Sequence, residues 1–120
     1  QWKHSIPINT LDNILVNRFN NRRILIKIDV EGAEFDLMSG AKETLARAIR
    51  PVWIVEICFK EHFSAGFNAN FTKTFKLFWD SGYQSFTIWN KALTIVRPQD
   101  VARWVDKGER DFGEVTFLFR

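Results

Sequence analysis

Residues 26–35 read IKIDVEGAEF, a stretch in which an apolar run ends in three carboxylates, Asp29, Glu31 and Glu34, grouped around Gly32. Residues 24–30 are almost continuously apolar, which is typical of a strand that is covered on both faces. In open α/β folds, ligands bind at the carboxyl ends of parallel strands. The stretch therefore predicts a strand that ends at a binding or catalytic site.

A second strand of the same kind is expected downstream. An amphipathic helix follows the first strand, with Gly40 as the point where it bends or divides and Pro51 as its end. Residues 52–58 (VWIVEIC) form another apolar run that carries Glu56 near its far end. A right-handed crossover makes two such strands parallel. We therefore expect Asp29 and Glu56 to emerge at the same edge of one sheet.

The rest of the chain continues the alternation of helices and strands. Further helices are expected from a cap at Asn9 or Thr10 through Phe19, from Asn70 to Gly82, and over residues 98–107. Shorter strands are expected over residues 83–89, 92–96 and 115–119. The helical spacing of the aromatic residues after Asn70 favours core packing over a base-stacking platform. We expect one α/β domain over residues 1–120.

Composition narrows the class of protein. The 120 residues are 46% hydrophobic and 15% aromatic, which is enough for one core and argues against disorder. The net charge of +3 is dispersed, so we expect no nucleic-acid partner. Cys58 is the one cysteine, which fits a reducing compartment. No segment reaches the roughly 18 apolar residues of a membrane span, and the first residues lack a signal-peptide pattern, so a cytoplasmic protein is expected.

At this point the motifs resemble a known family. Thr10-Leu11-Asp12 ahead of a helix, the string KIDVEGAE at residues 27–34, Ser39-Gly40-Ala41, and Ile54-Val55-Glu56 after a proline are similar to the FkbM-type methyltransferases. The resemblance implies a three-layer, Rossmann-like class I fold with S-adenosyl-L-methionine as cofactor. It also implies methyl transfer to a hydroxyl group of a sugar, lipid or natural product.

One family feature has no counterpart in the sequence. Family members carry, upstream of the matching region, a strand that ends in a glycine-rich turn for the cofactor, and none of the six glycines here forms such a turn. The resemblance then implies that the chain supplies the equivalents of strands four to seven, the last of them antiparallel, and half of the cofactor pocket. A missing amino-terminal half, or another copy, would pair with the exposed edge of the strand at residues 24–30.

The resemblance also suggests roles for the acidic residues. Asp29 would contact the cofactor and would orient or deprotonate the acceptor hydroxyl, with Glu56 as the second catalytic candidate. His62 is a candidate general base, since an unperturbed histidine has a pKa of about 6.5. Glu31 and Glu34 are candidates for cofactor binding.

Each assignment has a structural alternative. Asp29 and Glu34 would also be favourable at the amino end of the following helix, and His62 would simply be exposed in its loop. A divalent cation between Asp29 and Glu56 is the minority interpretation, because no histidine-rich or Asp-x-Asp pattern supports it, and we expect no metal. Two other functions stay open: a non-catalytic interaction or accessory domain, and a metal-dependent, acid-based hydrolase.

Overall fold

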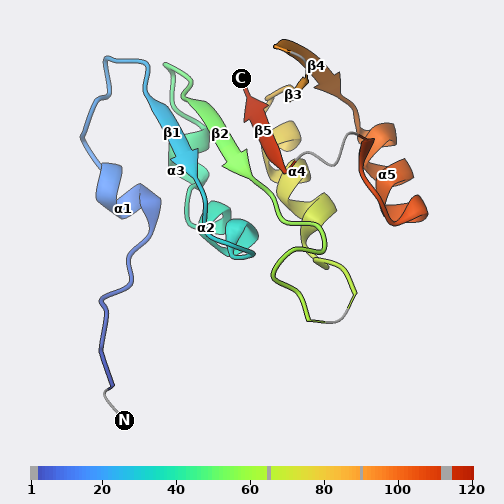
Figure 1. The fold of residues 1–120 in the computed structure, drawn as a ribbon. Helices are drawn as coiled ribbons and strands as arrows, with labels where there is room; N and C mark the ends of the chain where they lie inside the picture. The colour runs from blue at the N-terminus through green and yellow to red at the C-terminus, as the bar shows by residue number, and fades with distance from the viewer. Residues whose placement is uncertain (1–2, 65, 90, 112–114) are drawn as a thin grey trace.

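The computed structural model describes residues 3–64, 66–89, 91–111 and 115–120. Helices and strands are interspersed along the chain (Figure 1). The elements run in the order α1 (Leu11–Leu15), β1 (Leu25–Ile28), α2 (Glu34–Ser39), α3 (Lys42–Leu45), β2 (Val52–Glu56), α4 (Phe71–Asp80), β3 (Ser85–Trp89), β4 (Ala92–Val96), α5 (Pro98–Lys107) and β5 (Thr116–Phe119).

The strands form one mixed sheet in the order β1-β2-β5-β3-β4. Strands β1 and β2 are parallel, as the crossover between them predicts. The last strand, β5, is inserted between β2 and β3 and is antiparallel to both. Both the parallel pair and the antiparallel last strand are thus confirmed, and β4 extends the sheet as an antiparallel partner of β3.

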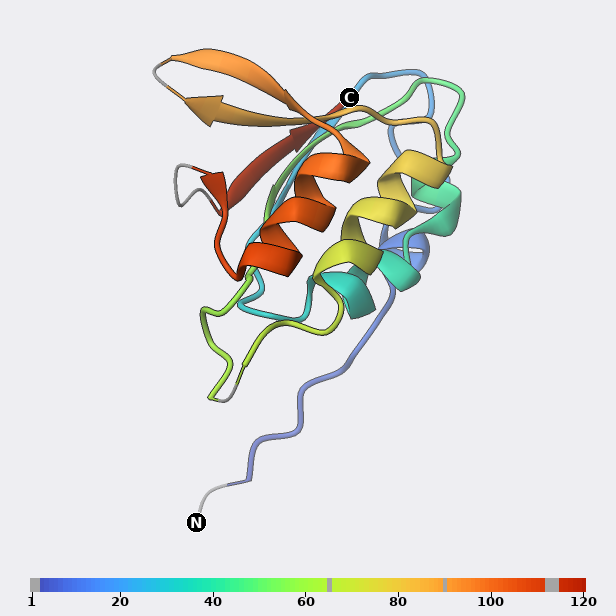
Figure 2. The same cartoon turned by 90° about the vertical axis from the view of Figure 1, so that its right-hand side faces the viewer.

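The helices in the described residues cover one face of the sheet, whereas we expected both faces to be covered (Figures 1 and 2). Burial along β2 alternates accordingly: Trp53 and Val55 are fully buried, and Val52 and Ile54 are half-buried. The order of the strands explains the difference. From β1 to β2 and from β2 to β3 the chain moves in the same direction across the sheet, so right-handed crossovers place both connecting helices on one face.

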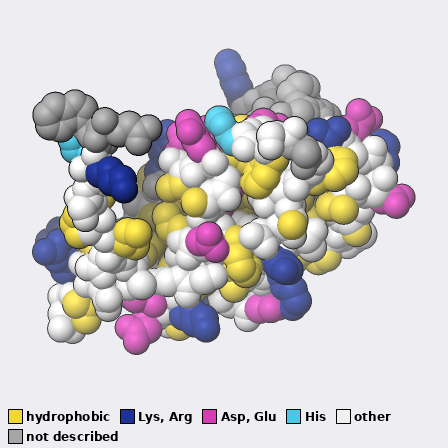
Figure 3. Space-filling view, turned by 90° about the horizontal axis from the view of Figure 1, so that it is seen from below, with side chains coloured by type: hydrophobic (Ala, Val, Ile, Leu, Met, Phe, Trp, Pro, Cys, Tyr) yellow, Lys and Arg dark blue, Asp and Glu magenta, His cyan; other side chains and the backbone are white. Residues whose placement is uncertain are grey.

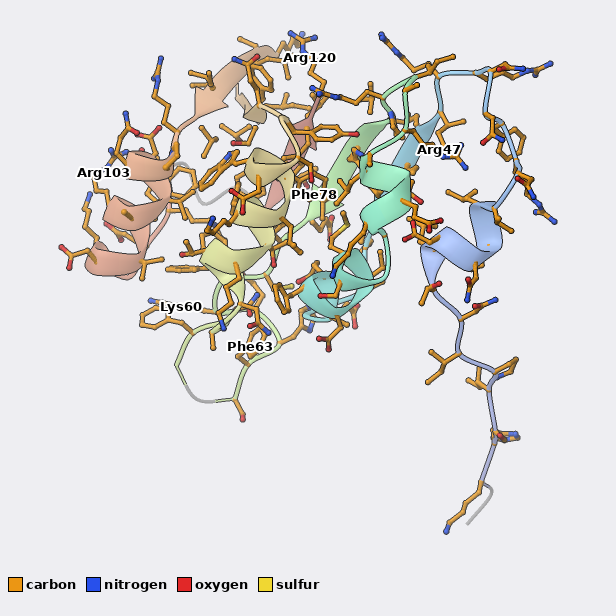
Figure 4. All side chains as sticks on the ribbon, turned by 180° about the vertical axis from the view of Figure 1, so that it is seen from behind. Arg47, Lys60, Phe63, Phe78, Arg103 and Arg120 are labelled. Atoms are coloured by element: carbon orange, nitrogen blue, oxygen red, sulfur yellow. The ribbon has the colours of Figure 1, made fainter. Side chains whose placement is uncertain are left out.

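Aromatic side chains fill the space between the helices and the sheet. Phe75 and Phe78 of α4 are fully buried, and the Phe78 ring stacks on Phe119 of β5 with 3.8 Å between ring centroids. Phe117 of β5 contacts both Phe75 and Trp104 of α5. Figure 4 shows Phe78 between its helix and the sheet. The expectation that the α4 aromatic residues form core is confirmed.

The first helix is shorter than expected. Thr10 caps it, because its Oγ1 accepts the Asn13 N–H at 3.1 Å, but α1 ends at Leu15 rather than continuing through Phe19. Asn17 and Phe19 have φ angles of 56° and 57°, which a right-handed helix does not allow. Phe19 is exposed, so no packing rewards further helical turns at this point.

A hydrogen-bonded junction joins α1 to α3. The Asp12 carboxylate accepts the backbone N–H groups of Glu43 at 3.0 Å and Thr44 at 2.8 Å, and the Thr44 hydroxyl at 2.7 Å. The Asp12 N–H donates to the Gly40 carbonyl. A Cβ atom at Gly40 would lie 3.1 Å from the Thr10 side chain, so glycine lets the two segments approach. The expected division at Gly40 is confirmed, since α2 ends before it and α3 begins after it.

None of the helices in the ranges described above is long and apolar enough to cross a membrane.

Candidate active site

Asp29 and Glu56 lie side by side at the carboxyl ends of the two parallel strands. Ile28 pairs with Val55 in the β1–β2 register, so the next residue on each strand is one of the two acids. Asp29 is exposed and Glu56 is half-buried. The sequence-predicted meeting of these carboxyl groups is therefore present in the fold.

The two carboxyl groups affect each other electrostatically. A hydrogen-bonding interaction with Asp29 raises the pKa of Glu56 above its usual 4.5, and partial burial and the negative charge of Asp29 act in the same direction. Lys27 opposes this shift and Glu31 adds to it. A carboxyl pair of this kind can share one proton. It can therefore accept a proton from a bound group, as a general base does.

The turn after β1 has an unusual backbone. Glu31 has a φ of 49° and Gly32 a φ of 106°, and the Ala33 N–H closes the turn on the Val30 carbonyl at 3.3 Å. A side chain at Gly32 would be strained and would meet the Phe63 ring at 3.3 Å. Glu31 itself points to no partner among the described residues and is exposed.

Glu34 lies beneath this turn and is 0% exposed. Its Oε1 atom accepts the Gly32 N–H at 2.8 Å, and the Cys58 Sγ is 3.9 Å from the same oxygen. Its Oε2 atom is buried without a hydrogen-bond partner in the described part of the chain. The buried Glu34 carboxylate thus holds the turn through the Gly32 N–H.

His62 belongs to the loop that follows β2. The ring of its neighbour Phe63 packs against Gly32, which brings this loop over the turn after β1 (Figure 4). His62 is exposed, with a φ of 66°, and makes no hydrogen bond or ion pair to Asp29 or Glu56 among the described contacts. The loop containing His62 therefore adjoins the site, while the imidazole remains separate from the carboxyl pair.

Glu61 fixes the start of the same loop, a role that the sequence did not reveal. Its carboxylate accepts the Phe59 N–H at 2.7 Å and pairs with Arg110 at 2.6 Å. The hydrogen bond from Arg110 lowers the pKa of Glu61 to about 2, against partial burial, which acts to raise it. The partner is 49 residues away in the sequence, so no local pattern could have indicated the pair.

A mainly apolar cavity adjoins the turn on the β1 side. Its volume is about 490 Å³, within the range of roughly 300–1,000 Å³ of small-molecule sites. Its walls come from α1 and the segment before it, from the turn and from α2, and include Ile8, Asn13, Val30, Ala33, Asp36 and Leu37. Figure 3, seen from below, shows hydrophobic side chains in a recess beside the amino-terminal segment.

Two further groups of side chains at this edge are the acidic residues, as possible metal ligands, and the thiol of Cys58. Within the described ranges, no three His, Cys, Asp or Glu side chains are grouped so that they could hold a metal ion. Burial, followed by the negative charges of Glu34, Glu61 and Glu56, raises the pKa of Cys58 to about 11. The Cys58 thiol is therefore protonated at neutral pH and is a poor nucleophile.

Comparison with known proteins identifies the family. Residues 4–85 match the family model of the methyltransferase FkbM domain. No curated protein and no solved structure gives a significant match to the chain. The matched residues cover more than half of the sequence and contain both strands and both acids of the candidate site. The chain therefore belongs to the methyltransferase FkbM domain family.

Proposed function

We propose that the chain acts in S-adenosyl-L-methionine-dependent methyl transfer to a hydroxyl group of a sugar, lipid or natural product. The single observation that carries the proposal is the adjacent carboxyl pair, Asp29 and Glu56, at the carboxyl ends of the parallel strands, where α/β folds bind ligands. Family membership supports the reaction class, since a methyltransferase family implies a cofactor of this type.

The residues at this edge suit such a cofactor. The cofactor supplies an electrophilic methyl group on a positively charged sulfonium, together with hydroxyl and ammonium groups that donate hydrogen bonds. Asp29 and Glu31 are exposed carboxylates that can accept these bonds and favour the positive charge. The adjoining cavity of about 490 Å³ has apolar walls for a flat ring.

The protein's own part in the chemistry is alignment and removal of a proton. The Asp29 carboxylate would accept a hydrogen bond from the acceptor hydroxyl. Glu56, whose pKa is raised, would share the proton that this hydroxyl loses. His62 is the second candidate base, once the loop over the turn carries it toward a bound acceptor. Glu34 would act indirectly, by holding the Gly32 N–H and thereby the turn.

We infer further that this chain provides one wall of the pocket within a single domain over residues 1–120. The glycine-rich cofactor turn of the family has no counterpart among the six glycines, and β1 is the edge strand of the sheet on the side of the cavity. A polypeptide segment that pairs with β1, from a further part of the protein or another copy, would supply the second wall.

Titration with S-adenosyl-L-methionine, followed by ¹H–¹⁵N spectra of the 120-residue chain, tests both parts of the proposal. We expect weak, millimolar binding with chemical-shift changes centred on residues 29–33, and loss of these changes in Asp29→Asn. Asp106→Asn, an exposed acid on α5, is the matched control and should behave as the parent.

The possible outcomes separate the two parts. Absence of shift changes at residues 29–33 would contradict the cofactor site. Micromolar binding by the chain alone would leave the site intact and overturn the half-pocket.

The non-catalytic interaction domain remains a second candidate, favoured by exposed apolar residues such as Leu25 of β1 and Phe19 after α1. Saturable binding of Mg²⁺ in the absence of the sulfonium would instead favour the hydrolase, with Asp29 and Glu56 as oxygen ligands.

A further inference from the structure

A hollow of about 500 Å³ lies at the end of the sheet opposite to the acidic residues. Its lining contains three arginines and no carboxylate side chain. We refer to it as the arginine hollow, and its lining residues are Arg23, Arg50, Pro51, Val52, Leu118 and Arg120.

Strand register explains why the three arginines meet. Leu25 pairs with Val52 in the parallel β1–β2 ladder, so two residues earlier Arg23 lies next to Arg50. The Val52 N–H donates to the Ile24 carbonyl at 2.9 Å, so the pairing continues to the residue that precedes β1. Trp53 pairs with Phe119 in the antiparallel β2–β5 ladder, so the next position brings Arg120 beside Val52. Three segments that are distant in sequence thus bring their arginines to one edge.

Aromatic rings and backbone groups hold two of the guanidinium groups in place. The Arg50 guanidinium lies 4.7 Å from the centre of the Tyr83 ring, and its Nη1 donates to the Gly82 carbonyl at 2.8 Å. The Arg120 guanidinium lies 5.0 Å from the centre of the Phe86 ring. Stacking of this kind leaves the edge of a guanidinium free to donate hydrogen bonds.

The arginine side chains of the hollow form no ion pair with an acidic side chain in the described part of the chain. Arg103 pairs with Asp100 and Asp111, and Arg110 pairs with Glu61. Arg23, Arg50 and Arg120 form no such pair among the described residues. Three like charges at one edge repel one another, and an anion between them would remove that cost.

We propose that the arginine hollow binds a small phosphate-bearing ligand. Guanidinium groups present planar pairs of N–H donors that match the oxygens of a phosphate, and charge-assisted bonds of this kind are the stronger ones. Val52, Leu118 and Pro51 add an apolar surface beside the arginines on which a non-polar part of the ligand can rest.

The proposed site is separate from the candidate active site. Arg23 and Arg50 precede the two parallel strands, whereas Asp29 directly follows β1 and Glu56 is the last residue of β2. Strand β1 alone spans roughly 13 Å between these edges, at about 3.3 Å per residue. Figure 4 shows Arg120 at the end of the molecule opposite to Phe63, whose ring packs on the acidic turn.

Isothermal titration of the 120-residue chain with inorganic pyrophosphate at low ionic strength tests the proposal. We expect saturable binding with one site, and a dissociation constant about tenfold higher in Arg23→Gln and in Arg120→Gln, as for the loss of a charge-assisted hydrogen bond. Arg22→Gln is the matched control, since it removes the same charge one residue away from the lining and should change the constant by less than about twofold. Circular dichroism would verify that each variant is folded.

Two results would overturn the site. Equal weakening by Arg22→Gln would show a diffuse positive field rather than a built site, and the absence of saturable binding would remove it altogether. Binding to phosphatidylglycerol vesicles that pyrophosphate does not displace would assign these arginines to a membrane-facing surface and would also overturn the proposal.

Discussion

The two lateral halves of the sheet are stabilised by different interactions. We call the half with β5 and α4 the packed side and the half with β1 and α1 the open side. On the side of β5 and α4, the side chains of Trp53, Phe75, Phe78 and Phe119 are fully buried and contact one another ring to ring. On the side of β1 and α1, Leu25 is 64% exposed and Phe19 is 53% exposed. Packing dominates the first side, whereas hydrogen bonds from Asp12 and the Thr10 cap hold the second.

This difference bears on function because the candidate active site lies at the border of the two sides. Asp29 follows β1, the edge strand, and Glu56 is the last residue of β2, whose alternate residues are buried in the aromatic core. Glu56 thus lies on a strand that packs into the aromatic core, whereas Asp29 follows the strand of the open side. A segment that covers the open side would adjoin both the cavity and the carboxyl pair.

The largest expected effect is the loss of an aromatic ring from the packed side. Phe78→Ala should lower the free energy of unfolding by about 3–5 kcal/mol, because it removes a fully buried ring and leaves a cavity. Urea unfolding followed by circular dichroism measures the change.

Phe19→Ala on the open side is the matched control. Its ring is exposed, so the expected change is below about 1 kcal/mol. If Phe19→Ala and Phe78→Ala lower the free energy of unfolding equally, the open side is as well packed as the core, and the contrast between the two sides is wrong.

The next effect concerns the polar junction of the open side. Asp12→Ala should cost about 1–2 kcal/mol, the usual value of a helix cap, since the carboxylate accepts two N–H groups at the start of α3. Burial acts to raise the pKa of Asp12, but hydrogen bonds from Thr44 and Glu43 outweigh it and lower the pKa below the usual 3.8.

The sign of this shift gives the pH dependence. A lowered pKa means that the Asp12 contribution is complete above pH 3.8 and is lost as the pH falls below that value. Urea unfolding of parent and variant should therefore differ at pH 7 and converge in acid. Asp106→Ala, an exposed acid on α5, is the control, and a pH-independent cost at Asp12 would point to packing instead of the cap.

The sequence predicted the parallel β1–β2 pair, the inserted antiparallel last strand and the meeting of Asp29 with Glu56. The parallel pair and the meeting of the two acids follow from local apolar patterns and one handedness rule, so no distant contact had to be known, whereas the antiparallel last strand was implied by the family resemblance. The expected coverage of both faces is wrong within the described residues, because a long apolar run does not by itself require two buried faces. Half of that apolar surface lies on the open face, as at Val52 and Ile54.

Features that depend on distant partners could not be predicted. The Glu61–Arg110 pair and the contact between Phe63 and Gly32 join segments that no periodicity relates. The early end of α1 reflects missing tertiary contacts at Phe19, which a helical pattern cannot reveal. The buried Glu34 carboxylate similarly contacts Cys58, 24 residues away in the sequence.

The smallest expected effect tests the carboxyl pair itself. Because the interaction with Asp29 raises the pKa of Glu56, the folded state holds the Glu56 proton more tightly than the unfolded chain does. That contribution to stability is complete below about pH 4.5 and is lost as the pH rises through the folded-state value. Glu56→Gln keeps the shape of the side chain without the charge, so it should stabilise the fold at pH 7 by about 0.5 kcal/mol, after allowance for solvent screening.

The same substitution should have no effect near pH 3, where Glu56 is protonated in both states. Glu109→Gln, at an exposed glutamate beyond α5, controls for the general loss of one negative charge. Urea unfolding at several pH values distinguishes the alternatives. Destabilisation by Glu56→Gln at pH 7 would mean that Glu56 is held as an anion by Lys27, which opposes the shift, and that Asp29 alone is left to receive the acceptor's proton.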